Sequence, residues 1–169
     1  MELVVSAGLF MILMVISFGI FTFGLRGQQR ALIQTRVDRE SQLIMEALAK
    51  KIRSSQVDYD FYTDSIVNPV DILALRDASN ISYVFSLGTN PPSFELSIDQ
   101  SPAISISSSL VNVTDVDFFI EPIINPFVPG QAPVTQPRVT VVFDISASKG
   151  AFQTSSKVEQ TIPQRGGAY

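Results

Sequence analysis

The sequence predicts an α+β protein in which one long N-terminal α-helix packs against a C-terminal antiparallel β-sheet, like a rod that carries a head. Two observations support this. Residues 1–56 contain no proline and place apolar side chains at helical spacing. Residues 57–169 contain all ten prolines and several short runs in which apolar and polar residues alternate. We therefore divide the chain into an N-terminal helix, 1–56, and a β-rich head, 57–169.

The first half of the predicted helix, residues 1–25, is apolar on every side. From Leu3 to Leu25 the chain runs for 23 residues without a charge, between Glu2 and Arg26. A helix of that length covers roughly 35 Å, enough to cross the hydrocarbon layer of a bilayer. The run is too long for the apolar region of a signal peptide, and no A-x-A-like cleavage site follows it. We expect this half to span a membrane.

The second half, residues 26–56, is amphipathic. It has one glycine, and its apolar residues recur mostly three and four positions apart, which forms one stripe on a helix. The stripe consists of Ile33, Val37, Ile44, Leu48 and Ile52. Because no helix breaker separates the halves, we expect one continuous helix of about 50 residues, roughly 80 Å long.

Strand signals follow one another through the head. The expected strands are 72–76, 81–87, 94–98, 103–107, 110–113, 116–120, 138–147 and 152–162. The clearest is 138–147, in which Val139, Val141, Phe143 and Ile145 would face inward. We expect one antiparallel meander whose apolar face is covered by the stripe of the helix.

Prolines and polar residues mark the loops of the head. Residues 122–137 carry five prolines and a glycine and are expected to form an exposed loop. Residues 57–69 are expected to form a solvated loop over the helix. The tail, 164–169, is expected to be loose or to dock on a neighbouring subunit.

The composition argues against several classes of protein. Cysteine and histidine are both absent, so there is no disulfide framework, no Cys/His metal site and no Ser-His-Asp or Cys-His catalysis. No glycine-rich phosphate loop or other catalytic motif stands out, so we expect neither an enzyme nor a cofactor. Residues 54–169 carry five Lys/Arg against twelve Asp/Glu, which argues against nucleic-acid binding by the head.

Two further patterns are weak. Asp58, Asp60 and Asp64 have a passing likeness to a calcium loop, but Thr63 and Pro69 stand where the loop needs Gly and Glu. We therefore expect no metal there. The triplets that begin at Asn80 and Asn112 match the N-glycosylation pattern, but they imply modification only in a compartment that has the machinery.

Glu2 is the one charge at the head of the apolar run. A carboxylate buried among aliphatic side chains would cost several kcal/mol unless it were paired. The physics of an isolated helix favours the alternative, in which Glu2 lies among headgroups and is solvated.

At this point the residues resemble a family. Glu-Leu-Val-Val before an unbroken apolar run, then an amphipathic half and a β-rich region, is similar to the type IV pilins and pseudopilins. The resemblance implies that the glutamate, here Glu2, neutralises the N-terminal amine of a neighbouring subunit during filament assembly. It also implies a prepilin peptidase and an assembly platform as partners. Family members carry a processing glycine and a methylated phenylalanine ahead of the glutamate, where this sequence has only Met1. Either the chain starts further upstream or the subunit is processed differently.

The apolar half has glycines where many major pilins have a proline. Gly8, Gly19 and Gly24 each weaken a helix by about 1 kcal/mol relative to alanine. They predict either local unwinding near 19–24 during assembly or close packing between helices. Both alternatives stay open, and we count the three glycines with Glu2 as candidate assembly residues.

The resemblance implies a structural subunit that is stored in the cytoplasmic membrane with its head outside and then joins a helical homo-oligomeric filament with other pilins at the cell surface. The arginines after the span, Arg26, Arg30, Arg36 and Arg39, would by the positive-inside rule place the head in the cytoplasm, and here we follow the resemblance instead. Two alternatives remain: a minor pseudopilin of a type II secretion or DNA-uptake system, and a membrane-anchored adhesin or receptor domain that does not polymerise.

Overall fold

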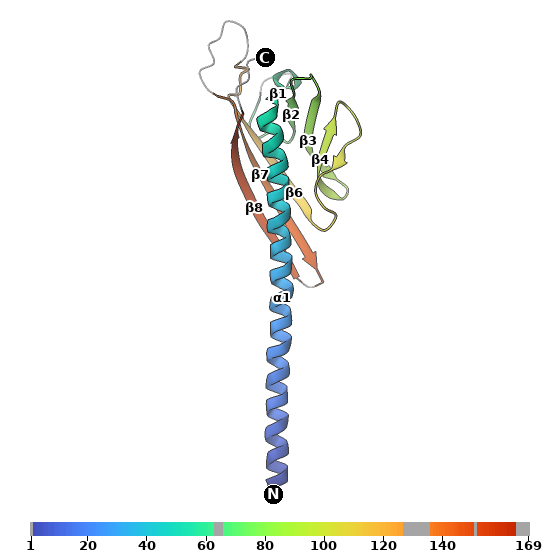
Figure 1. Cartoon of the computed structure of the whole chain (residues 1–169), viewed down its shortest axis with the longest axis vertical. Helices are drawn as coiled ribbons and strands as arrows, with labels where there is room; N and C mark the ends of the chain where they lie inside the picture. The colour runs from blue at the N-terminus through green and yellow to red at the C-terminus, as the bar shows by residue number, and fades with distance from the viewer. Residues whose placement is uncertain (1, 63–65, 127–135, 151, 165–169) are drawn as a thin grey trace.

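The computed structural model describes residues 2–62, 66–126, 136–150 and 152–164. One long helix, α1 (Glu2–Ser54), runs the length of the molecule, and all the strands gather around its C-terminal half (Figure 1). The described residues form eight strands in two antiparallel sheets. This arrangement confirms the predicted α+β class, with a long N-terminal helix on a C-terminal β head.

The helix is continuous over 53 residues, which corresponds to about 80 Å. It ends at Ser54, within the segment 1–56 that we assigned to the helix. Lys51 and Arg53 lie in its last turn, where their positive charges interact favourably with the negative end of the helix dipole. Ser54 closes that turn with a hydrogen bond from its Oγ to the carbonyl of Lys51 at 3.1 Å.

The three-stranded sheet lies directly against the helix. It consists of β6 (Asn112–Glu121), β7 (Arg138–Lys149) and β8 (Phe152–Pro163), in the order β6-β7-β8. The central strand confirms the predicted inward face, because Val139, Val141, Phe143 and Ile145 are all buried. The hairpin of β7 and β8 reaches down beside the helix toward its exposed half (Figure 1).

The remaining strands form a five-stranded sheet of their own. In chain order they are β1 (Gln56–Val57), β2 (Leu73–Arg76), β3 (Ser82–Thr89), β4 (Pro92–Ile98) and β5 (Ile104–Ser105), each paired with the next. A 3₁₀ helix, η1 (Tyr59–Phe61), follows β1. Strand β1 begins two residues after the helix ends.

The prediction of a single meander is wrong, because the strands divide between two sheets. A helix about 10 Å across covers roughly two strands spaced 4.8 Å apart, so one eight-stranded sheet would leave most of its apolar face bare. The five-stranded sheet instead packs its apolar face toward β6. Phe94 of β4 stacks on Phe85 at 5.9 Å between ring centroids and meets Phe118 of β6 at 6.4 Å. Both sheets and the helix thereby share one core.

Backbone and side-chain bonds tie the end of the head to the end of the helix. Gln164 is buried, its Nε2 donates to the carbonyl of Ser55 at 3.0 Å, and its backbone N–H donates to the carbonyl of Pro137. Residues 127–135 of the predicted Pro-rich loop, and 165–169 of the predicted tail, lie outside the described residues.

Candidate membrane and assembly surface

The N-terminal half of α1 projects from the head as a bare rod (Figure 1). None of the 18 consecutive residues with the highest mean hydropathy is buried against the described part of the chain. Sixteen large apolar side chains between Leu3 and Leu25 are exposed, and Leu3 and Phe23 are exposed by 82% and 80%. By length and composition this helix could cross a membrane and hold the protein there.

Glu2 lies in the first turn of the helix at the free end of the rod. Its backbone carbonyl accepts a hydrogen bond from the Ser6 hydroxyl at 2.9 Å. The structure gives its carboxylate no hydrogen bond or ion pair with any described side chain. Glu2 is therefore a charge at an apolar tip with no side-chain partner among the described residues of the same copy.

The three glycines predicted for assembly lie in open space. A Cβ built on Gly8, Gly19 or Gly24 would meet no atom within 4 Å. The helix is regular through all three positions, and the Thr22 hydroxyl donates to the carbonyl of Gly19 at 2.9 Å. The open surface beside the glycines is compatible with both predicted roles and selects neither.

The five stripe residues lie between the helix and the head. Val37, Leu48 and Ile52 have no exposed surface, and Ile33 and Ile44 are exposed by only 3% and 2%. Ser41, Met45 and Ala49 complete the buried face of the helix. The same helix therefore has one half that the head covers and one half that no described part of the head covers.

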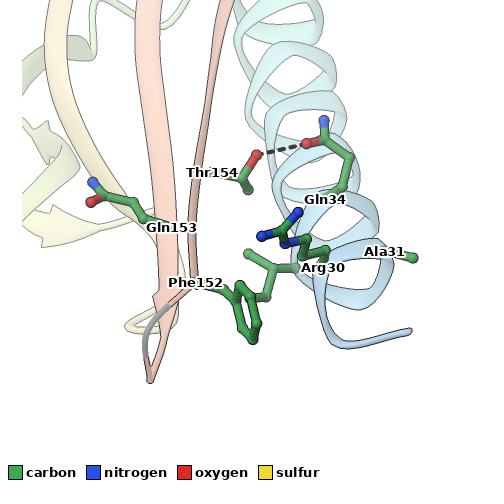
Figure 2. Close-up of a pocket in the computed structure, with 7 residues that line it drawn as sticks. Arg30, Ala31, Gln34, Phe152, Gln153 and Thr154 are labelled. Atoms are coloured by element: carbon green, nitrogen blue, oxygen red, sulfur yellow. Dashed lines mark hydrogen bonds between the residues drawn. The ribbon is translucent and has the colours of Figure 1, made fainter. Parts of the chain in front are cut away.

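Near the boundary between the two halves lies a neck, where Phe152 and Thr154 at the start of β8 face Arg30 and Gln34 of the helix (Figure 2). The guanidinium of Arg30 lies over the ring of Phe152, 5.0 Å from its centroid. The Thr154 hydroxyl donates to Oε1 of Gln34 at 2.7 Å. These four side chains line an open cavity of about 490 Å³. Gly150, at φ +61°, provides the left-handed turn residue that reverses the hairpin here.

Sequence reasoning missed the neck pair, because 122 positions separate Arg30 from Phe152. The only available signal was that Arg30 lies three residues before Ile33, the first residue of the stripe, and has no acidic residue three or four positions away on the helix. Only the three-dimensional course of the hairpin brings the two together.

The predicted solvated loop over the helix is partly buried. Asp58 is exposed by only 7% and accepts two hydrogen bonds from Arg76, at 2.7 Å from Nη2 and 3.1 Å from Nε. These bonds raise the pKa of Arg76. Asp64 lies outside the described residues. In the part of the chain that the structure describes, no group of three His, Cys, Asp or Glu side chains could hold a metal ion.

No protein-family model, curated protein or solved structure matches this chain. The fold and the surface therefore define the class by their geometry alone. Among the described residues, the chain's one α-helix is a membrane-compatible rod in its N-terminal half and a core element of the β head in its C-terminal half.

Proposed function

We propose that this chain is a structural subunit of a type IV pilus-like filament. The apolar half of the helix is stored in the cytoplasmic membrane, with the head on the extracytoplasmic side. During assembly the subunit leaves the lipid, and its apolar half packs against the same half of other copies. The heads then cover the outside of the filament at the cell surface.

The observation that carries the proposal is the uncovered apolar half of α1. Burial of a large apolar side chain stabilises by about 1.5–3 kcal/mol, so sixteen such side chains in water would cost on the order of 25 kcal/mol or more. That cost greatly exceeds the stability of an ordinary domain, roughly 5–15 kcal/mol. The rod therefore needs a cover, first lipid and then other copies of itself.

Glu2 supports polymerisation over simple anchoring. A helix that only anchors a head does not require a carboxylate at its far tip, where the charge gains only a modest interaction with the positive end of the helix dipole. In a bundle of helices, a carboxylate at the tip can pair with the N-terminal amine of a neighbour, and a buried pair fixes the register of packing. The resemblance to the pilins assigns the same role to this residue.

A minor pseudopilin of a type II secretion or DNA-uptake system uses the same rod and head, and differs in the length of the filament and in the other subunits. A membrane-anchored adhesin or receptor domain uses only the lipid-covered state. Strict monomers in cells with the whole assembly apparatus would favour that second alternative.

The experiment compares Glu2→Ala with a matched control, Glu46→Ala, which removes an exposed carboxylate from the covered half of the same helix. Both variants are produced in cells that carry a complete filament apparatus, and the chain is quantified in the membrane and in the sheared surface fraction. We expect Glu2→Ala to remain in the membrane at normal abundance and to disappear from the sheared fraction. Glu46→Ala should distribute like the unmodified chain.

Normal appearance of Glu2→Ala in the sheared fraction would show that Glu2 has no assembly role. Absence of the unmodified chain from that fraction would contradict the filament itself. The two results therefore test separate parts of the proposal.

A further inference from the structure

We propose that the neck formed by Arg30 and Phe152 binds the phosphate of an acidic phospholipid while the helix is in the membrane. The inference rests on the membrane-stored state of the proposed function and assigns a lipid partner to it. The chemistry recognised is a phosphate anion, and the position of the neck identifies a lipid headgroup as its source.

The position of the neck along the helix gives its depth in a bilayer. The uncharged run ends at Leu25, and Arg30 lies five residues further, about 7.5 Å along the axis. The headgroup region adds roughly 5–7 Å to each side of the hydrocarbon layer. An arginine can extend its side chain several ångströms toward this region. Arg30 and the hairpin tip therefore lie within reach of lipid phosphates.

The charge of the neck is positive. Arg26 lies one turn below Arg30, and strand alternation places Lys149 on the same face of the hairpin as its partner Phe152. None of the side chains that line the cavity is acidic. The nearest carboxylate along the helix is Asp38, two turns above Arg30, where it accepts a hydrogen bond from Gln34.

The geometry leaves the donors of Arg30 available. The contact with Phe152 places the guanidinium over the ring but uses none of its five N–H groups. The structure gives Arg30 no ion pair and no side-chain hydrogen bond with any described residue. A flat guanidinium with free donors suits the bidentate recognition of phosphate oxygens.

The aromatic half of the neck suits the same depth. Phe152 is half-buried, with its ring turned toward the helix at the lower end of the head (Figure 2). A ring at this level can contact the upper acyl chains while the guanidinium above it binds the phosphate. The neck therefore places an apolar ring at the level of the acyl chains and a cationic group at the level of the phosphate, the order in which a phospholipid presents these groups.

The test uses the full chain in neutral detergent micelles, with bound lipids counted by native mass spectrometry. Phosphatidylglycerol is titrated against phosphatidylcholine, and 10 mM inorganic phosphate is added in a parallel arm. Arg30→Gln is compared with Arg39→Gln, an exposed arginine nine residues higher on the same helix. Phe152→Leu is the second variant, and circular dichroism verifies that every variant is folded.

We expect the unmodified chain to prefer phosphatidylglycerol and Arg30→Gln to reduce this preference about fivefold, the effect of one cation at a lipid surface. Phe152→Leu should reduce it less, Arg39→Gln should preserve it, and inorganic phosphate should not displace the lipid. Equal losses in Arg30→Gln and Arg39→Gln, or no loss in Arg30→Gln, would overturn the site. Displacement by inorganic phosphate would overturn the lipid as its source.

Sedimentation of the unmodified chain with phosphatidylglycerol vesicles after alkaline washing separates this inference from the proposed function. Failure to remain with the vesicles would contradict membrane storage, and the lipid site would fall with it. Stable insertion together with an unchanged Arg30→Gln would overturn the lipid site alone.

Discussion

The substitution Leu48→Ala tests whether the helix is part of the core of the head. Leu48 has no exposed surface and belongs to the cluster that joins the helix to both sheets. Truncation to alanine removes three carbons from this cluster, a loss of about 2.4 kcal/mol at roughly 0.8 kcal/mol per carbon. The cavity that remains adds to this, which gives a total loss of about 3–4 kcal/mol in the free energy of unfolding.

The matched control is Leu32→Ala on the same helix, where the leucine is 67% exposed. Alanine is at least as good a helix former as leucine, so the control should change the free energy of unfolding by less than about 1 kcal/mol. Both variants are unfolded with guanidinium chloride in a neutral detergent and followed by the near-ultraviolet circular dichroism of the tyrosines. We expect the midpoint to fall by about 1 M for Leu48→Ala only. Equal midpoints for the two variants would refute the reasoning that the head is built on the helix.

Three further predictions concern the head. Asp58→Ala removes the buried partner of Arg76 and should lower the free energy of unfolding by about 1–2 kcal/mol; the loss stays this small because the half-exposed arginine can turn to water. No measurable loss of stability in denaturant unfolding would contradict a stabilising role for the pair. Gln164→Ala should lower the free energy of unfolding by about 1–2 kcal/mol, because it releases the end of β8 from the end of the helix. Gln164→Leu keeps the side-chain volume and removes a buried oxygen that has no hydrogen-bond partner, so it should lower the stability less. A larger loss for Gln164→Leu than for Gln164→Ala in thermal unfolding would be inconsistent with this. Burial raises the pKa of Tyr59 and of Tyr62 to about 12, so the stability that the two neutral phenols contribute is complete below pH 10 and is lost as the pH rises from 10 to 12. Tyr62→Phe should make the free energy of unfolding depend less on pH over that range, and a constant stability of the unmodified chain there would contradict the prediction.

The rod and its stripe could be predicted from the sequence because both depend on local spacing. The uncharged run from Leu3 to Leu25 and the recurrence of Ile33, Val37 and Ile44 are properties of one continuous segment. A helix expresses such properties with no reference to the rest of the chain. The inward face of β7 was predictable for the same reason, since strand alternation is local too.

The division into two sheets could not be predicted in this way. The alternation of apolar and polar residues around Phe94 and around Phe118 indicates that each lies in a strand with an apolar face, but it does not indicate which sheet the strand joins. The choice depends on how many strands one helix can cover and on contacts between distant segments, such as the antiparallel bridge between Val70 and Phe118. The burial of Gln164 against Ser55 also joins segments more than 100 residues apart.

The candidate surface was predicted in part. The sequence indicated Glu2, the glycines and the apolar run, and the structure adds that no described residue of the same copy buries the most apolar 18-residue stretch of that run. The neck at Arg30 and Phe152 was not predicted, because no short motif marks a cation–π pair between a helix and a hairpin tip. Its discovery needed the position of the hairpin.

The central claim is that apolar rods of many copies pack together with the heads outside. Electron cryomicroscopy of the sheared surface fraction, from cells that make the chain with its assembly apparatus, tests it most directly. The account predicts fibres whose cross-section shows a core of helices, with Gly8, Gly19 and Gly24 at helix contacts or at an unwound segment, inside a shell of β heads. Fibres that lack this chain, or a chain found only as single copies in lipid, would contradict it.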